Sequence, residues 1–251
     1  MRETAYAKLN LALHVRAREP GGYHRIETIF AFCEDGDLLT ATEADSLGLT
    51  VSGPFAAALG EGDNLALRAA RSLGRKVALT LDKRLPVAAG LGGGSADAAA
   101  VLRMLSGGME VAAELGADVP ACLLSRTALG TGRGEMLEPL EIEGLAGTPV
   151  LLVNPGVPLA TAAVFAGWDG VDRGPLGAWE EGRNDLQPAA VALVPAIAEV
   201  LGALAGARVA RMSGSGATCF GLYDSEAERD AAAARIAAAR PGWWVSQTRL
   251  R

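Results

Sequence analysis

A glycine-rich stretch, PVAAGLGGGSAD at residues 86–97, is the first candidate for chemistry in the chain. Glycine fills four of the five positions 90–94, and an alanine-rich run directly after them predicts a helix from Ala96 to Leu105. Glycine permits unusual backbone conformations and lets a ligand come close to the backbone. Free amides and the positive end of the dipole at a helix start attract anions. The stretch therefore predicts either a phosphate-binding loop or a flexible turn with Ser95 as a plain N-cap.

The stretch matches neither of the two common nucleotide-binding loops. A P-loop needs a lysine directly after its last glycine, and no lysine occurs between Lys83 and the end of the following helix. A dinucleotide-binding loop needs a third glycine where Ser95 stands. The sequence thus excludes a P-loop NTPase, and a phosphate bound here would be held by backbone amides.

Asp118 and Lys8 each have a structural and a chemical interpretation. Asp118 precedes Val-Pro in GADVP, which favours a helix N-cap with proline in the first turn, and a catalytic carboxylate is the alternative. Lys8 lies on the polar side of a predicted strand, where lysine is ordinarily solvated. It shares that side with Asn10, however, and its neighbours are apolar.

Two further motifs lie beside glycines. Tyr23 and His24 follow a Gly-Gly turn, and His24 is one of only two histidines. Such a histidine is typically a surface or hydrogen-bonded residue, while Tyr23 offers a stacking surface for a planar ring. SGSGAT, residues 213–218, is either a hairpin turn or a second glycine-lined wall against a ligand.

Composition and charge restrict the class of protein. The 251 residues, 50% of them hydrophobic, suffice for one large or two small globular domains. The net charge is −6 and no basic block occurs, so nucleic acid is not an expected partner. Cys33, Cys122 and Cys219 lie far apart, without metal-ligand spacing, and do not suggest a disulfide framework. The N-terminus lacks the apolar core of a signal peptide, so we expect a cytoplasmic protein.

Apolar periodicity predicts the elements that position these residues. The N-terminal strand has two alternating faces, one with Leu9, Leu11, Leu13 and Val15, the other with Lys8, Asn10, Ala12 and His14. Further strands are predicted at 26–33, 37–41, 47–51, 77–81, 150–154, 207–213, 219–223 and 243–250, with a glycine-turned hairpin at 128–140. Further helices are predicted at 65–73 with Asn64 as its cap, at 109–115, from Asp118, from Thr161, at 184–201 with Pro195 as a candidate interruption, and at 226–239. GLAGTP, residues 144–149, is the best candidate for a domain boundary. This mixture predicts a two-domain α+β protein.

Residues 148–168 carry no charge over 21 positions and could be mistaken for a membrane span. Pro149, Pro155 and Pro158, together with Gly156, would break a spanning helix, because lipid cannot satisfy the freed backbone groups. We therefore predict a buried strand, a turn and a helix start here, and no membrane partner.

The motifs together, in their order along the chain, resemble the GHMP kinase superfamily. The motifs are AKLNLALHV near the N-terminus, PVAAGLGGGSADAA near residue 90, GADVP at 116–120 and MSGSGATCF at 212–220. GGYHRIET at 21–28 and NDL at 184–186 narrow the resemblance to members whose substrate carries a cytidine diphosphate. The resemblance covers nearly the full chain.

The resemblance implies a two-domain GHMP kinase fold of the α+β class. Residues 1–147 would form an ATP-binding domain like ribosomal protein S5, and residues 148–251 a ferredoxin-like α/β sandwich. It also implies ATP-dependent phosphorylation of the 2-hydroxyl on the methylerythritol moiety of a cytidine diphosphate substrate, in the non-mevalonate isoprenoid route. Mg²⁺ would accompany the ATP phosphates, and its protein ligands are not assigned.

The resemblance also implies roles for single residues. Asp118 would accept the proton of the attacking hydroxyl, and Lys8 would stabilise the developing negative charge. Asn10 matches a substrate-side residue, and Tyr23 and His24 match residues that hold the cytosine ring. The phosphate loop would comprise Pro86, Val87, Ala88, Ala89, Gly90, Leu91, Gly92, Gly93, Gly94, Ser95 and Ala96.

Ala88 and Ala89 stand where this family usually has glycine. Because alanine is strained at positive φ, we predict that neither position requires positive φ in this chain. Two rival functions stay open. One is another kinase of the superfamily, acting on homoserine, mevalonate or a sugar, and the other is a non-catalytic ligand-binding relative.

Overall fold

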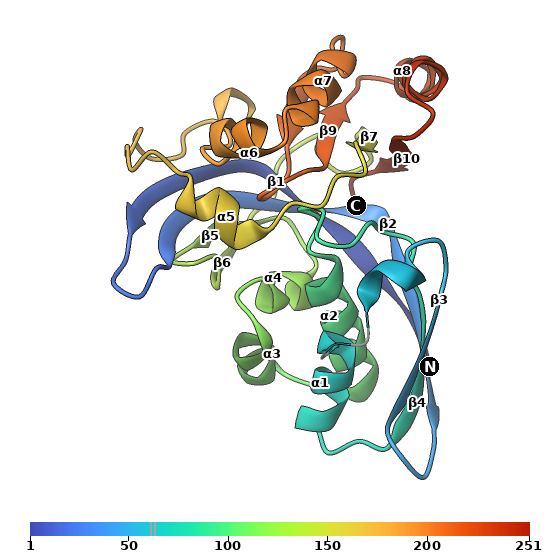
Figure 1. Cartoon of the computed structure of the whole chain (residues 1–251). Helices are drawn as coiled ribbons and strands as arrows, with labels where there is room; N and C mark the ends of the chain where they lie inside the picture. Colours follow the sequence, from blue (N-terminus) through green and yellow to red (C-terminus); the bar gives the residue numbers. More distant parts are fainter. Residues whose placement is uncertain (61, 63) are drawn as a thin grey trace.

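The computed structural model describes residues 1–60, 62 and 64–251 and contains two β-sheets with helices packed on each (Figure 1). The first sheet has six strands: β1 (Arg2–Arg18), β2 (His24–Glu43), β3 (Gly48–Ser52), β4 (Val77–Asp82), β5 (Ala128–Thr131) and β6 (Met136–Pro139). Its order is β3-β4-β2-β5-β6, with β1 paired to β2. Neighbouring strands are antiparallel except β3 and β4.

A long antiparallel ribbon of β1 and β2 forms the middle of the molecule (Figure 1). A short turn joins the two strands, in which the Glu19 amide donates to the Tyr23 carbonyl at 2.8 Å. The two strands predicted at 26–33 and 37–41 are therefore wrong as separate elements. They are one strand, because β1 pairs with β2 on both sides of Gly36 and no turn separates them.

Four helices pack against the first sheet, with a short 3₁₀ turn, η1 (Ala56–Leu59), ahead of them. They are α1 (Leu65–Ser72), α2 (Gly93–Leu105), α3 (Met109–Leu115) and α4 (Val119–Leu124). Asn64 caps α1 as predicted, since its Oδ1 accepts from the Ala66 amide at 2.8 Å. The predicted start of α2 at Ala96 is wrong, because the helix begins three residues earlier with Gly92 as its N-cap. Small alanine side chains let α2 lie close to β1 and β2, with most of its residues buried.

The second sheet and its helices also agree with the predicted α+β class. Its strands are β7 (Pro149–Asn154), β8 (Val209–Met212), β9 (Cys219–Leu222) and β10 (Trp244–Arg249), in the antiparallel order β10-β7-β9-β8. The helical segments are α5 (Thr161–Ala166), η2 (Trp179–Glu181), α6 (Gln187–Leu193), α7 (Ala196–Ala203) and α8 (Glu226–Ala239). The helices α7 and α8 pack on the sheet, which gives the β-α-β-β-α-β arrangement of a ferredoxin-like unit. Pro195 interrupts the predicted 184–201 helix, because it has no amide to continue the hydrogen-bonding pattern.

The two sheets share buried side chains. One apolar cluster combines Leu9 and Leu11 of β1 with Val150 and Leu152 of β7 and Phe220 of β9. Figure 1 accordingly shows the β1–β2 ribbon between helices α1–α4 on one side and α6 and α7 on the other. Both faces of β1 are covered over its middle, so the alternation read from sequence does not separate a buried face from a solvated one. The domain boundary at 147/148 stays a prediction.

The uncharged segment 148–168 forms β7, a connection and α5, as predicted. In the described part of the chain, none of the helices has the length and apolar character that crossing a membrane requires.

Candidate active site

Lys8 and Asp118 lie side by side. Lys8 Nζ is 3.3 Å from Asp118 Oδ2, with the lysine side chain 3% exposed and the aspartate side chain 42% exposed. Lys8 belongs to β1, and Asp118 directly precedes α4. The pair therefore places one buried ammonium group against one accessible carboxylate.

Lys8 is held by polar neighbours on the β1–β2 ribbon. Its Nζ donates to Asn10 Oδ1 at 3.0 Å and lies 4.7 Å from the centre of the Phe30 ring. Asn10 Nδ2 donates to Thr28 Oγ1 at 2.8 Å, and Thr28 Oγ1 donates to the Ala12 carbonyl at 2.6 Å. Each polar atom of this hydrogen-bond network has a partner, and the network therefore fixes the buried ammonium group in place. Lys8 is therefore not the solvated lysine that is ordinarily found on the polar side of a strand.

Asp118 occupies the N-cap position of α4, but its side chain accepts no capping hydrogen bond. The cap interpretation is therefore correct for its position in the sequence and wrong for its carboxylate. The carboxylate is left to face Lys8 and the solvent-accessible cavity described below.

The glycine stretch packs backbone to backbone against residues 213–218. Ser213 Oγ donates to the Gly90 carbonyl at 2.9 Å, and the Thr218 amide donates to the Ala89 carbonyl at 3.2 Å. A Cβ atom at Gly90 would lie 2.2 Å from the Ser213 carbonyl oxygen, so only glycine permits this contact. The segment 213–218 is thus both the turn between β8 and β9 and a wall beside the stretch.

Gly92 makes room for the lysine. A Cβ atom there would lie 2.9 Å from Lys8 Cε, and the residue has φ +63°. The Lys8 amide also donates to the Leu91 carbonyl at 2.9 Å, which ties the stretch to β1. The glycines therefore serve close approach by Ser213 on one side and by Lys8 on the other.

The prediction of φ at the two alanines of the stretch is wrong for one of them. Ala88 has φ +52°, in the left-handed region, whereas Ala89 is not among the residues with positive φ. Ala88 is exposed and Ala89 is buried. The contacts of Ala89 and Gly90 with residues 213–218 fix the turn, so Ala88 adopts the conformation that glycine would take more easily.

The stretch turns its carbonyl groups toward the protein. The carbonyls of Ala89, Gly90 and Leu91 all accept hydrogen bonds from Thr218, Ser213 and Lys8. In contrast, none of the amides from 87 to 95 donates to another described residue outside the helix. Ser95 lies inside the first turn of α2 and is not its N-cap. Free amides at the start of a 13-residue helix form a site for an anion.

A buried ion triad holds both ends of the stretch together. Lys83 Nζ contacts Asp37 Oδ2 at 2.5 Å and Asp97 Oδ2 at 2.7 Å. Asp37 Oδ1 also accepts from the amides of Arg84 and Leu85, directly before the stretch. Asp97 belongs to α2, directly after it, so the triad closes the loop at its base.

The triad shifts the pKa values of its members. Burial raises the pKa of Asp97 to about 7, although Lys83 opposes the shift. Burial alone would lower the pKa of Lys83, but Asp97 and Asp37 outweigh it and raise that pKa. Asp97 Oδ1 is buried without a partner in the described structure, which agrees with a carboxyl group that binds a proton readily.

The NDL motif ties β1 to the turn 213–218. Asn184 Nδ2 donates to the Met212 and Gly214 carbonyls, both at 2.8 Å. Asp185 Oδ2 accepts from the Val15 amide at 2.8 Å, on the strand that carries Lys8. The motif therefore has a structural role next to the site.

A cavity of about 860 Å³ joins these features. Lys8, Asp118 and Asn10 line it, with the glycine stretch and with Gly214 and Ser215. Tyr23 and His24 also line it. Of the predicted loop residues, those that line it are Ala88, Ala89, Gly90, Gly92, Gly93, Gly94 and Ser95. The other four, Pro86, Val87, Leu91 and Ala96, do not.

Residues that sequence reasoning missed surround Tyr23 and His24. Arg133 lies over the Tyr23 ring at 3.9 Å, and the Phe165 ring centre is 5.0 Å from that of His24. Arg18 Nε donates to His24 Nε2 at 3.3 Å. Arg133 lies in the turn of the predicted hairpin 128–140 and Phe165 in the helix predicted from Thr161, but nothing in the sequence placed either residue beside Tyr23 and His24.

His24 is enclosed by aromatic side chains and Arg18. Its pKa is lowered, first by burial and then by the positive charge of Arg18. Trp168 packs edge-on against it, with ring centres 5.6 Å apart. The aromatic neighbours and Arg18 therefore fix the imidazole at the cavity wall.

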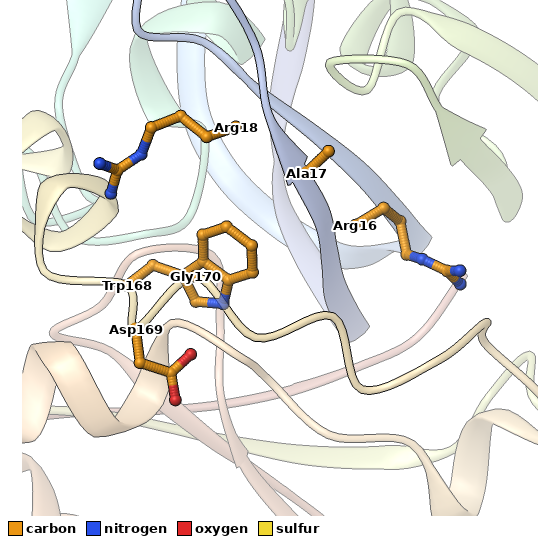
Figure 2. Close-up of a pocket in the computed structure, with 6 residues that line it drawn as sticks. All are labelled: Arg16, Ala17, Arg18, Trp168, Asp169 and Gly170. Carbon is orange, nitrogen blue, oxygen red and sulfur yellow. The ribbon is translucent and has the colours of Figure 1, made fainter.

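A second pocket of about 440 Å³ is lined by Trp168, the residue that packs against His24 (Figure 2). Its lining residues are Arg16, Ala17, Arg18, Trp168, Asp169 and Gly170. The side chains of Arg16 and Arg18 extend in opposite directions from Trp168 in Figure 2, so the two guanidinium groups do not converge on a common ligand. Among the described residues, Arg18 alone is common to the linings of both cavities.

Comparisons with known proteins agree with this architecture. The GHMP kinases N terminal domain matches residues 64–126, and the GHMP kinases C terminal family matches residues 172–241. A 4-diphosphocytidyl-2-C-methyl-D-erythritol kinase from Rhizorhabdus wittichii is 54% identical, over 99% of this chain and 94% of the relative. A crystal structure of a 4-(cytidine 5'-diphospho)-2C-methyl-D-erythritol kinase is similar with a TM-score of 0.83 and 34% identity, over 99% of both chains.

A more distant similarity shows the fold alone. The homoserine kinase from Cytophaga hutchinsonii has a TM-score of 0.65 at 16% identity, over 98% of this chain and 95% of that one. Because both domain matches and the full-length similarity agree, this chain belongs to the GHMP kinase family and, within it, to the family of the 4-diphosphocytidyl-2-C-methyl-D-erythritol kinases.

Proposed function

We propose that this chain transfers the γ-phosphoryl group of ATP to the 2-hydroxyl of 4-diphosphocytidyl-2-C-methyl-D-erythritol. The observation that carries the proposal is a single cavity with three chemically distinct parts. It has free backbone amides at the start of α2, the Lys8–Asp118 pair beside them, and the enclosed ring of His24 with Tyr23. These parts suit a triphosphate, a reacting hydroxyl and a planar base.

The Lys8–Asp118 pair performs the proton transfer in this proposal. Asp118 accepts the proton of the attacking hydroxyl, since its carboxylate is accessible and makes no capping bond. Lys8 stabilises the negative charge that develops on the attacking oxygen. Burial of the ammonium group and its bond to Asn10 keep it in place, so no reorganisation is needed when the charge appears.

The glycine stretch fits the phosphates of ATP. Its free amides lie at the positive end of the dipole of α2, and its carbonyls are turned away into hydrogen bonds with the protein. The Lys83 triad lies below the stretch and closes its base, so the loop is formed before a ligand binds. Backbone donors thereby take the place of a P-loop lysine.

Mg²⁺ belongs to the proposal as the companion of the ATP phosphates. The described residues contain no group of three or more histidine, cysteine or acidic side chains arranged for a metal. This fits Mg²⁺, which ordinarily keeps several waters and binds through one or two protein oxygens and the phosphates. Ser95 lines the cavity in the first turn of α2 and would supply one of those oxygens, while Asp118 stays free to act as the base. The ion would neutralise charge on the terminal phosphates.

The cytoplasm is the proposed location of this reaction. Cys33, Cys122 and Cys219 are all buried and free, as expected of a chain that folds in a reducing compartment. The substrates are small molecules, and no nucleic acid takes part.

A substrate panel tests the proposal. ADP release is measured with the cytidine diphosphate substrate and separately with homoserine, mevalonate and galactose. We expect release with the first substrate alone. Faster release with one of the others would assign a different kinase activity, and ATP binding without release for any acceptor would indicate a ligand-binding relative.

A further inference from the structure

Arg18 and His24 form a directly opposed pair at the end of the β1–β2 ribbon. They are partners in the strand register, on either side of the turn that begins at Glu19. Arg18 Nε lies 3.3 Å from His24 Nε2, and Arg18 Nη2 donates to the Ala166 carbonyl at 3.4 Å. The guanidinium group therefore connects β1 to His24 and to the end of α5, which carries Phe165.

The contact with Arg18 determines which ring nitrogen of His24 carries the proton. A guanidinium group has donors and no acceptor, so Nε2 must present its lone pair to Arg18. A neutral imidazole has one N–H group, which therefore lies on Nδ1. Burial and the charge of Arg18 lower the pKa of this histidine, which favours the neutral form.

The Nδ1 atom is available to a ligand. No group in the described part of the chain forms a hydrogen bond with it, and it is not among the enclosed atoms that lack a partner. His24 is one of the residues that line the main cavity. The cavity therefore receives a hydrogen-bond donor at this position and no acceptor.

We propose that Arg18 is a positioning residue that holds His24 as the Nδ1–H tautomer and thereby makes the cavity select cytosine over uracil. The inference rests on the proposed function, in which His24 contacts the base of the substrate. Ring nitrogen N3 is an acceptor in cytosine and an N–H donor in uracil. A fixed donor matches the first base and leaves two donors facing each other with the second. A histidine free to change tautomer could accept from uracil instead.

The test combines NMR with steady-state kinetics on the full chain. Nitrogen-15 spectra report the tautomer of each imidazole, and the chain has only two histidines, so a His14→Gln variant assigns both signals. We expect Nδ1–H for His24 in the wild-type protein and a mixture of tautomers in Arg18→Met. We also expect the kcat/KM ratio of the cytidine to the uridine substrate to fall by roughly tenfold in Arg18→Met, the effect of about one hydrogen bond. The KM for ATP should not change.

Arg16→Met is the matched control. Arg16 lies two residues earlier on β1, pairs with Glu27 and Asp172, and extends away from Arg18 (Figure 2). This variant should keep both the His24 tautomer and the base ratio.

Three results would overturn the inference. They are an Nε2–H tautomer of His24 in the wild-type protein, an unchanged base ratio in Arg18→Met, or an equal loss of selectivity in Arg16→Met. The wild-type spectrum decides the tautomer even if Arg18→Met does not fold. Failure of the proposed function is recognised separately, because the wild-type protein would then not phosphorylate the cytidine substrate at all.

Discussion

Asp118 is the N-cap residue of α4, but its carboxylate makes no capping hydrogen bond and lies 3.3 Å from Lys8 Nζ. An N-cap side chain ordinarily satisfies one of the free amides of its own helix. Here the carboxylate faces the cavity and a buried ammonium group from another element. Asp118 therefore has the sequence position of an N-cap residue, while its side chain belongs to the cavity.

Asp118→Asn should therefore lower kcat strongly and leave stability nearly unchanged. Removal of a general base typically costs about 10²–10⁴ in rate. The free energy of unfolding should fall by no more than about 1 kcal/mol, because no cap bond is lost and the carboxylate that pairs with Lys8 is half exposed. Steady-state kinetics and urea unfolding measure the two effects. Near-normal kcat in this variant would remove Asp118 from the mechanism.

Ser225→Ala is the matched control for that variant. Ser225 is a true N-cap, with Oγ accepting from the Glu228 amide at 3.3 Å at the start of α8. Its loss should lower the free energy of unfolding by about 1 kcal/mol without an effect on kcat.

His24→Ala should weaken one substrate only. The imidazole lines the part of the cavity with Tyr23 and is distinct from the glycine stretch. We expect the KM of the cytidine substrate to rise roughly tenfold, the effect of one lost contact, while the KM for ATP stays constant. Measurement of both constants is decisive, since equal increases would point to a general loss of structure.

Ala88→Gly and Ala89→Gly should change stability in opposite directions. Ala88 has φ +52°, so glycine should relieve strain and raise the free energy of unfolding by about 1 kcal/mol. Ala89 is buried without positive φ, so glycine there should lower it by about 1 kcal/mol. Urea unfolding of the two variants provides the measurement, and a decrease for Ala88→Gly would contradict the strained conformation.

Asp97→Asn should alter the pH dependence of stability. Burial raises the pKa of Asp97 from 3.8 to about 7, so the folded state binds this proton more tightly than the unfolded state. The contribution of Asp97 to stability is therefore largest below pH 4, falls as the pH rises toward 7, and is constant above that. An asparagine has no such dependence.

Urea unfolding of the wild-type protein and Asp97→Asn at about pH 5 and about pH 8 measures this difference. The variant should gain stability relative to the wild-type protein as the pH rises. A relative loss would mean that the attraction to Lys83, and not burial, dominates the pKa of Asp97.

Much of the fold could be predicted from local patterns. The cap at Asn64, the break at Pro195 and the hairpin 128–140 depend on residues near in sequence, and each is confirmed. The continuity of β2 could not be predicted. The segment around Gly36 looks like a turn, and only its pairing with β1 makes it a strand.

In the site, too, the contacts between residues far apart in the sequence could not be predicted. The glycine stretch can be recognised from its composition. The contact that requires Gly92, however, is made by Lys8, on a strand far away in the sequence. The φ of Ala88 was mispredicted, because the preference of alanine for negative φ is overridden by contacts between Gly90 and Ser213. Lys83, Asp37 and Asp97 look like ordinary charged residues in the sequence, and only the fold buries them together.

Phosphorus-31 NMR of the reaction with ATP and the cytidine diphosphate substrate tests the central claim most directly. The account predicts one new phosphomonoester signal, with a coupling pattern that places it on the tertiary 2-hydroxyl, and intact signals of the cytidine diphosphate. Release of inorganic phosphate without that signal, or a phosphate on another hydroxyl, would contradict it.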